Sequence, residues 1–243
     1  MEKKEMAGEV ISHILGRHLL LQPSQGYHFS IDSVLLADFA PLVKGPVADL
    51  GAGSGILCVL LAAKGVEGPY TALELDSVAA YCCRENLART GAEARVFQQD
   101  LTQKNPEVPG NSYSLVISNP PFTPKGAGRV PPDPARARAR HELNLEPKDL
   151  WRAAARLLKP KGRFVFCWPA ARLVQAFGDL PRAGLMPKRL RLSHGREGKP
   201  ASLAMVEAVK GGKEELTVEP PLIVYAEGQE QSKEVQAIYR RLS

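Results

Sequence analysis

At residues 47–63 the chain reads Val47-Ala-Asp-Leu-Gly51-Ala-Gly53-Ser-Gly55-Ile-Leu-Cys-Val-Leu-Leu-Ala-Ala63, and this stretch decides the fold that the sequence predicts. A short apolar strand runs into three alternate glycines, and an apolar, helix-forming stretch follows them. Glycines let the backbone turn tightly and let a ligand approach it closely, and the helix behind them begins with free N–H groups. We therefore expect a strand, a ligand-binding turn and a helix here, although a glycine turn alone is also compatible with a plain tight turn.

Two acidic residues at the ends of the next predicted strands extend this pattern. Glu74 ends the strand that begins at Tyr70, and it follows Gly51 by 23 positions. This is close to the spacing of about 20 at which an acid reaches ribose hydroxyls in nucleotide-binding folds. Asp100 follows another predicted strand at 94–99. The glycine spacing is G-x-G-x-G with Asp49 just before it, which differs from the G-x-G-x-x-G of dinucleotide sites.

Strands and helices alternate through the middle of the chain. We expect strands at 46–50, 69–75, 94–99, 113–118 and 162–168, and helices at 54–64, 77–90, 147–158 and 170–178. This alternation predicts an α/β fold: a mostly parallel sheet with helices on both faces. Ligands of such sheets bind outside the carboxyl ends of the strands. The glycine turn, Glu74, Asp100 and a further motif at 119–122 all follow the ends of predicted strands.

The two ends of the chain have a different character. Residues 5–15 suggest a short helix, residues 17–29 a hairpin with its turn at 23–26, and residues 33–42 a helix capped by Asp32. In the C-terminal third no helix separates the predicted strands 188–192, 201–209 and 214–218, so we expect these strands to pair antiparallel. A further edge strand at 222–225 and a helix at 234–240 should follow them. We expect an extension at 1–45 that packs on one domain at 46–243.

The fourth motif is Asn119-Pro120-Pro121-Phe122, directly after the apolar run 113–118. The Asn119 side-chain oxygen and the Pro120 carbonyl can both accept hydrogen bonds from an exocyclic amino group. The prolines stiffen the turn, and Phe122 can stack on the ring that carries the amine, although a core position for this aromatic residue is an alternative. No His or Glu adjoins the motif, so the pattern indicates positioning and electrostatic help rather than base catalysis.

These motifs carry a family resemblance. Residues 49–55 resemble the first motif of class I S-adenosylmethionine-dependent methyltransferases, and residues 119–122 resemble the motif of amino-group methyltransferases. The chain from about 21 to 239 is similar to the branch that methylates N6 of adenine 37, beside the anticodon of a bacterial valine tRNA; residues 22–37 and 139–142 support this branch. The resemblance implies S-adenosyl-L-methionine as cofactor, RNA, specifically tRNA, as partner, and a class I (Rossmann-like) fold with a C-terminal antiparallel hairpin.

The resemblance also implies roles for individual residues. Catalysis falls to Asn119, Pro120 and Phe122. The cofactor-binding residues are Asp49, Gly51, Gly53, Gly55, Glu74, Asp100 and Asn119, with Asp49 either fixing the loop or reaching the cofactor's amino group. The residues expected to contact the substrate are Phe29, Pro121, Phe122, Lys125, Arg129, Arg136 and Arg140. Packing is the alternative for Phe29, a surface turn for Asp100 and a solvated strand end for Glu74.

Because of Phe122, the sequence does not decide whether the methylated base is adenine or guanine. This residue stands where the tRNA enzymes usually have Tyr, and Phe is familiar among the guanine-N2 methyltransferases of ribosomal RNA. A third alternative is methylation of a protein glutamine side chain at N5, but those enzymes have a helical substrate domain ahead of the glycine motif and only 48 residues precede Asp49. A binding module with a dead site is the non-enzymatic alternative, which the intact motifs disfavour.

Charge and composition fit a cytoplasmic RNA enzyme. The formal net charge is +6 and the pI about 9.2, which favour nucleic acid only slightly. Basic residues form two clusters: Lys125, Arg129, Arg136, Arg138 and Arg140, and then Arg182, Lys188, Arg189, Arg191, Arg196 and Lys199. We expect them to form a face for phosphates, with a solvated charge run as the alternative. The four cysteines lack metal-type spacing, so we expect no metal, and no apolar run is long enough to span a membrane.

Overall fold

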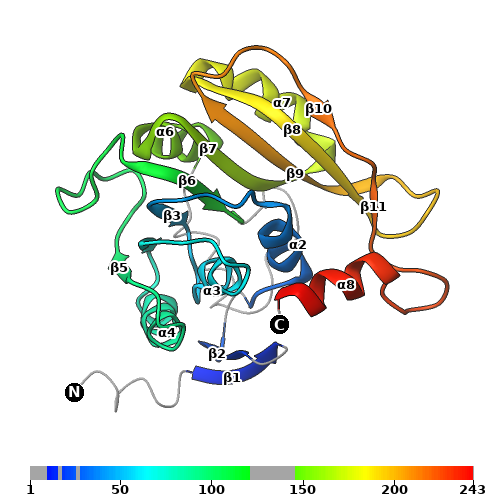
Figure 1. The fold of residues 1–243 in the computed structure, drawn as a ribbon, viewed down its shortest axis with the longest axis horizontal. Coiled ribbons are helices and arrows are strands. Elements are labelled where there is room, and N and C mark those ends of the chain that lie inside the picture. The colour runs from blue at the N-terminus through cyan, green and yellow to red at the C-terminus, as the bar shows by residue number, and fades with distance from the viewer. Residues whose placement is uncertain (1–9, 16–17, 26–27, 121–145, 243) are drawn as a thin grey trace.

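A computed structural model describes residues 10–15, 18–25, 28–120 and 146–242, and a nine-stranded sheet forms its centre (Figure 1). Five parallel strands lie in the order β7-β6-β3-β4-β5. Their bounds are β3 (Val47–Leu50), β4 (Tyr70–Glu74), β5 (Ala94–Gln98), β6 (Tyr113–Ser118) and β7 (Leu158–Pro169). β3 and β6 consist of buried residues throughout, as expected for strands covered on both faces. The predicted parallel sheet is confirmed.

Helices cover both faces of the sheet, and each face has its own apolar core (Figure 1). One core contains residues of α2 (Ile31–Phe39), α3 (Ile56–Ala63), α4 (Ser77–Ala88) and α8 (Lys233–Leu242). The other contains α6 (Pro147–Leu157) and α7 (Leu173–Asp179), which follows a short 3-10 turn, η1 (Ala170–Arg172). α6 buries Trp151 against Phe164 and Phe166 of β7. The glycine turn leaves the sheet between β3 and α3, so it lies at the carboxyl edge.

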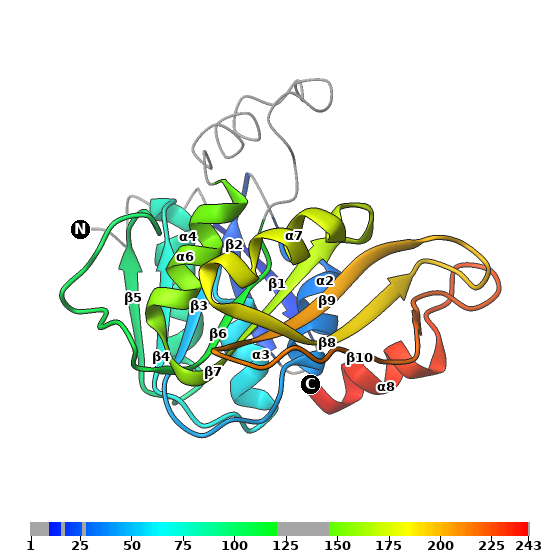
Figure 2. The same ribbon diagram turned by 90° about the horizontal axis from the view of Figure 1, so that it is seen from above.

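The C-terminal strands extend the sheet beyond β7. β8 (Leu185–His194) follows a second 3-10 turn, η2 (Pro181–Ala183), and β9 (Ala201–Lys210) pairs antiparallel with both β7 and β8, as predicted. β10 (Thr217–Val218) and β11 (Leu222–Ile223), however, pair with β8 in parallel, so the antiparallel pairing expected for 214–218 is wrong. β9 returns the chain to the start of β8, and the chain then runs along the free edge of β8 in the same direction. Figure 2 shows the β8–β9 hairpin at the opposite end of the molecule from β5.

The N-terminal hairpin differs from the prediction. β1 (Val10–Leu15) and β2 (His18–Pro23) pair antiparallel with Leu15 opposite His18. The helix expected at 5–15 is therefore a strand over its described part, and the chain reverses between Leu15 and His18 rather than at 23–26. Pro23 ends β2 instead of opening a hairpin turn. α2 begins two residues earlier than expected, so Asp32 lies in its first turn, while Ser30 occupies the cap position and its side chain accepts no capping bond from a backbone N–H of the helix.

Candidate active site at the carboxyl edge of the sheet

The glycine turn presents its backbone to open space at two of its three glycines. Gly51 and Gly53 have φ angles of 71° and 55°, which favour glycine, and a Cβ at either would meet no atom within 4 Å. Gly55 differs, because a Cβ there would lie 2.7 Å from the Cys83 sulfur of α4. The first two glycines therefore leave room for a ligand beside the loop, while Gly55 allows α4 to pack closely against it.

Glu74 fixes the geometry of this loop from the end of β4. One carboxylate oxygen accepts the N–H of Gly53 at 2.7 Å, and the other accepts the N–H groups of Leu75 and Asp76 at 2.8 and 2.9 Å. Burial raises the pKa of Glu74, and these backbone bonds oppose that increase. A carboxylate has about four acceptor positions, so the side chain keeps capacity for a hydroxyl group beside the glycine turn.

Asp49 lies behind the loop and is fully buried. One of its oxygens accepts a weak bond from the Cys58 thiol at 3.7 Å, and the other has no hydrogen-bond partner. Desolvation raises the pKa of Asp49 to about 8. Of the two roles considered for this residue, complete burial favours the one in which Asp49 holds the loop over direct contact with a bound molecule.

Asp100 and Phe29 have local partners. An oxygen of Asp100 accepts both the backbone N–H and the hydroxyl of Thr102, at 2.8 and 2.7 Å, which closes a turn after β5. The Phe29 N–H donates to the Gln22 side chain at 2.9 Å, and its half-buried ring packs against the core on the α2 face. Their expected contacts with cofactor and substrate stay predictions.

Asn119 continues directly from β6, next to β3 in the sheet, so it shares the carboxyl edge with the glycine turn. Its Nδ2 donates to the Ser33 hydroxyl oxygen at 3.0 Å, whereas its Oδ1 is buried and has no partner. Pro120 is buried beside it. Ser118, one residue earlier, fixes the end of β6 by donating to the Leu50 carbonyl oxygen at 2.7 Å. The site thus holds a rigid, unused acceptor at a strand end.

Sequence reasoning did not identify Ser33. It lies in the first turn of α2, is 2% exposed and contacts a residue 86 positions later. The available signal was the pair Asp32-Ser33 in a helix whose other residues up to Leu36 are apolar. Buried polar side chains in such a position need hydrogen-bond partners, which a sequence pattern does not identify.

Several predicted substrate-binding residues fall in 121–145, which lies outside the described residues. These are Pro121, Phe122, Lys125, Arg129, Arg136 and Arg140, together with Arg138. Their predicted roles stay predictions.

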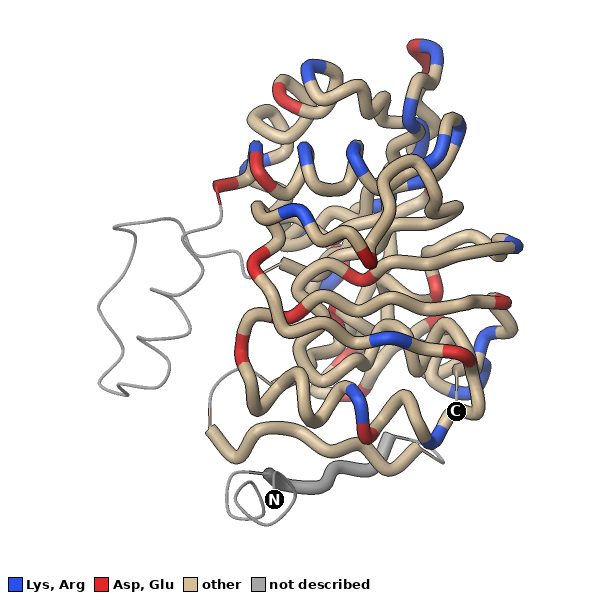
Figure 3. The backbone as a smooth tube through the Cα atoms, turned by 90° about the vertical axis from the view of Figure 1, so that its left-hand side faces the viewer, with Lys and Arg blue, Asp and Glu red and all other residues tan. Residues whose placement is uncertain are grey.

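The second basic cluster is largely neutralised by acids. Arg189 pairs with Glu207 and Glu219, Arg191 with Glu234, Lys188 with Glu215 and Arg182 with Asp179. Figure 3 shows Lys and Arg interspersed with Asp and Glu over one side of the molecule. The expectation that this cluster forms one face for phosphates is therefore not supported at these four positions. Arg196 and Lys199 lie on the turn after β8.

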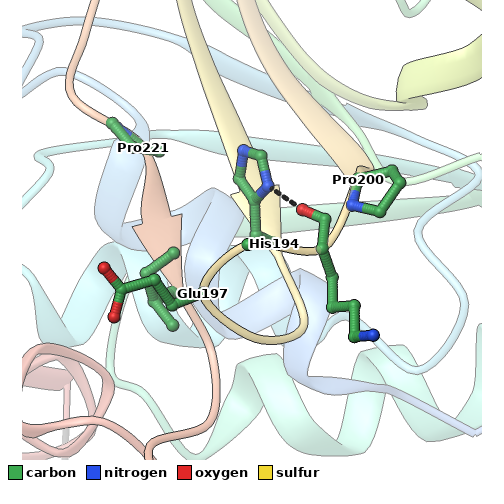
Figure 4. Close-up of a pocket in the computed structure, with 7 residues that line it drawn as sticks. His194, Glu197, Pro200 and Pro221 are labelled. Carbon is green, nitrogen blue, oxygen red and sulfur yellow. Dashed lines mark hydrogen bonds between the residues drawn. The ribbon is translucent and has the colours of Figure 1, made fainter.

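A hollow of about 530 Å³ lies beside this turn, between the β8–β9 connection and β11 (Figure 4). His194 Nδ1 contacts the Lys199 carbonyl oxygen at 2.7 Å at its rim. Its lining combines basic and acidic residues with prolines: His194, Glu197, Gly198, Lys199, Pro200, Pro221 and Ile223. β9 and β7 separate β8 from β6 in the sheet, so this hollow is distinct from the Asn119 site.

The described part of the chain contains no helix of the length and apolarity needed to cross a membrane. Among those same residues, no group of three or more His, Cys, Asp or Glu side chains is arranged to hold a metal ion. All four cysteines are free and buried.

Comparison with known families assigns the chain to one of them. The profile of the methyltransferase small domain family matches residues 30–172, more than half of the chain. This chain belongs to the methyltransferase small domain family. The matched residues include the glycine turn, Glu74, Asp100 and Asn119, so the family assignment covers the site described above.

Curated relatives of this methyltransferase family member are tRNA1(Val) (adenine(37)-N6)-methyltransferases. The protein from Aeromonas salmonicida is 38% identical over 143 residues, which are 58% of each chain. The protein from Photobacterium profundum is 29% identical over 84% of this chain and 86% of its own length, and that from Bacteroides fragilis is 30% identical over 72% and 74%. The match thus spans somewhat more than half of the first of these relatives and most of the other two.

Solved structures show the same fold. A protein from Agrobacterium tumefaciens, described as a predicted O-methyltransferase, has a TM-score of 0.63 and 22% identity over 87% of this chain and 97% of its own. The Thermus thermophilus 16S rRNA N2 G1207 methyltransferase has a TM-score of 0.57 and 21% identity over 83% of this chain and 50% of its own. The methyltransferase family member therefore has the class I, Rossmann-like fold that the sequence predicted.

The residues at the carboxyl edge fit S-adenosyl-L-methionine, the cofactor of class I methyltransferases. The open backbone at Gly51 and Gly53 leaves space for a ligand, and Glu74 can accept hydroxyl groups next to it. The buried Asn119 oxygen beside them has no partner, which is costly unless a donor group next to the cofactor, such as an amine to be methylated, bonds to it. We name Gly51, Gly53 and Glu74 as the residues that would hold the cofactor.

Proposed function

We propose that this protein transfers a methyl group from S-adenosyl-L-methionine to the N6 amine of an adenine in RNA, specifically in tRNA near the anticodon. The observation that carries the proposal is the Asn119 amide: its Oδ1 is buried and has no partner at the same sheet edge as the open glycine turn. The names of the curated relatives support adenine N6 and tRNA as the target.

The chemistry requires positioning rather than a base. The lone pair of adenine N6 is delocalised into the ring, so the amine is a poor nucleophile. Hydrogen bonds from its two N–H groups to Asn119 Oδ1 and to the Pro120 carbonyl oxygen favour a tetrahedral nitrogen whose lone pair faces the methyl group. When bound, the cofactor supplies an electrophilic methyl group on a sulfonium.

The reaction balances without a protein base. Held by Gly51, Gly53 and Glu74, the cofactor would supply the methyl group to N6, and the electron pair of the broken sulfur–carbon bond would remain on the cofactor's sulfur. The methylated amine then releases one proton to water. The two acceptors at Asn119 and Pro120 stabilise the positive charge that develops on N6. The target base must lie outside any base stack to reach them.

The test uses the full chain, labelled S-adenosylmethionine and tRNA that lacks modifications, followed by digestion to nucleosides. We expect N6-methyladenosine, and we expect Asn119→Ala to lower its rate of formation by about 10²–10³-fold, the cost of removing one preorganised group that stabilises developing charge. Cofactor affinity, measured by calorimetry, should change little in this variant.

The other outcomes separate the alternatives. N2-methylguanosine would assign a guanine target, and transfer to ribosomal RNA or to protein glutamine but not to tRNA would end the tRNA proposal. Transfer that persists in Asn119→Ala would contradict the role of the amide.

A further inference from the structure

The Asn119 side chain is useful only in one of its two orientations. An Asn amide has an acceptor oxygen on one side and two N–H donors on the other. An incoming amine is itself a donor, so it needs the oxygen. If the amide were turned around, donors would face donors. Oδ1 must therefore face the incoming amine while the N–H groups bond elsewhere.

Ser33 is the group in contact with the other side of this amide. Asn119 Nδ2 donates to Ser33 Oγ at 3.0 Å, while Oδ1 has no partner. Ser33 is 2% exposed, so solvent does not compete for this bond. No other side-chain contact of the Asn119 amide occurs among the hydrogen bonds of the described residues.

The backbone of α2 fixes the position of Ser33. The Ser33 N–H donates to the Ser30 carbonyl oxygen at 3.1 Å, and the Cys167 thiol of β7 donates weakly to the Asp32 carbonyl oxygen at 3.8 Å. At the other end of α2, Lys64 donates to the carbonyl oxygen of Ala37 at 3.1 Å and also to those of Asp38 and Ala40. A helix held at both ends gives a precise position to a side chain in its first turn.

We propose that Ser33 is a positioning residue: its hydroxyl oxygen accepts from Asn119 Nδ2 and anchors the amide, which leaves Asn119 Oδ1 available for the amino group of the substrate. This inference rests on the proposed function and adds a second residue, from a different element, to the same site. Ser33 acts through Asn119 and does not itself contact the reacting atoms.

The first test needs no substrate. In the ¹⁵N-labelled protein, the Asn119 side-chain amide signals are identified by their loss in Asn119→Ala, and their exchange with solvent is measured. We expect slow exchange in the unaltered protein and, in Ser33→Ala, exchange faster by about fivefold or more, since one neutral hydrogen bond is lost. Unchanged exchange in Ser33→Ala would overturn the inference whatever the enzyme's activity.

The second test measures catalysis. We expect Ser33→Ala to lower kcat about five- to twentyfold, the equivalent of one lost hydrogen bond, with little change in cofactor affinity. The double variant Ser33→Ala/Asn119→Ala should be no slower than Asn119→Ala, because Ser33 acts only through that amide. Additive losses, or an unchanged kcat in Ser33→Ala, would overturn the inference.

Two variants separate hydrogen bonding from packing. Ser33→Cys keeps the side chain's shape but replaces the oxygen with a weak acceptor, so it should resemble Ser33→Ala if the bond matters. Recovery of kcat in Ser33→Cys would overturn the inference in favour of packing. Ser114→Ala is the matched control: it removes a buried hydroxyl, one that donates to the Lys44 carbonyl oxygen at 2.9 Å, at the opposite end of β6. It should leave the Asn119 signals and kcat unchanged.

The outcomes also distinguish the inference from the proposed function. If the unaltered protein transfers no methyl group to any RNA, the proposed function fails, and amide exchange alone decides the Ser33 contact. If the unaltered protein is active and both tests show no effect of Ser33→Ala, only the inference fails.

Discussion

Single buried polar atoms define the chemistry of the site. Asn119 Oδ1 and one oxygen of Asp49 are both buried without partners, and they lie at the ends of neighbouring strands. Unpaired buried acceptors are costly, so a folded protein keeps few of them without a function. Asp49 lowers the cost by staying neutral, because burial raises its pKa to about 8.

This buried carboxyl predicts a pH dependence of stability. The ordinary pKa of Asp is 3.8, so between about pH 4 and 8 the folded chain holds a proton that the unfolded chain has lost. Raising the pH through this window should therefore lower the free energy of unfolding, by at most about 1.4 kcal/mol per pH unit from this group. Asp49→Asn should remove that contribution, which urea unfolding at pH 5 and pH 8 would measure. Equal pH dependence in both proteins would contradict the raised pKa.

Between elements, one amide joins the N-terminal hairpin to the glycine turn. Asn86 of α4 is 2% exposed and donates to the carbonyl oxygens of Leu21 and Ser54, both at 2.8 Å. Its side-chain oxygen accepts the Leu21 N–H, also at 2.8 Å. β2, α4 and the turn at 51–55 are thus connected through a single side chain.

Asn86→Ala should weaken the contacts that connect β2, α4 and the turn at 51–55. We expect it to lower the free energy of unfolding by about 2–4 kcal/mol, because three hydrogen bonds are lost and buried backbone groups stay unpaired. It should also weaken cofactor binding, since Ser54 belongs to the glycine turn. Urea unfolding and calorimetry measure the two effects. Arg84→Ala, an exposed change on the same helix, is the control, and a loss of similar size there would contradict the role of Asn86.

At the scale of the whole molecule, a charge network around the buried Glu207 connects the C-terminal strands to α2. Glu207 of β9 is 2% exposed and pairs with Arg163 of β7 and Arg189 of β8. The Arg189 guanidinium also lies 4.0 Å from the centre of the Phe39 ring and donates to the Phe39 carbonyl oxygen at the end of α2. The network therefore supports the helix that carries Ser33.

Glu207→Gln should test this network. Removing the charge takes the common partner from Arg163 and from the half-buried Arg189, and it leaves a buried side chain without its ion pairs, so we expect the free energy of unfolding to fall by about 2–4 kcal/mol. Glu215→Gln is the matched control, because it removes the same charge from an exposed carboxylate, which pairs with Lys188, and it should cost less than about 1 kcal/mol. A similar decrease in the free energy of unfolding in both variants would show that the buried position of Glu207 does not strengthen its ion pairs.

The sequence by itself determined the central sheet and the edge that carries the site. Strands β3 to β6 and helices α3 and α4 lie within two residues of their predicted bounds, because most of them are apolar or amphipathic runs bounded by glycines or polar residues. Parallel strands end at the same edge, so Gly51, Glu74 and Asn119 had to converge once the alternation was recognised. The local sequence pattern was therefore sufficient to predict the central sheet and the edge that carries the site.

Only the tertiary structure decided which polar groups pair. The strand at 10–15, the parallel edge strands β10 and β11, and the neutralised arginines of the second basic cluster all depend on partners distant in sequence. The contact between Ser33 and Asn119 is the clearest case, since 86 residues separate them. Hydrogen bonds and ion pairs need a geometry that only the packed chain supplies, whereas the spacing of apolar residues along the sequence is enough to predict which face of a helix or strand is buried.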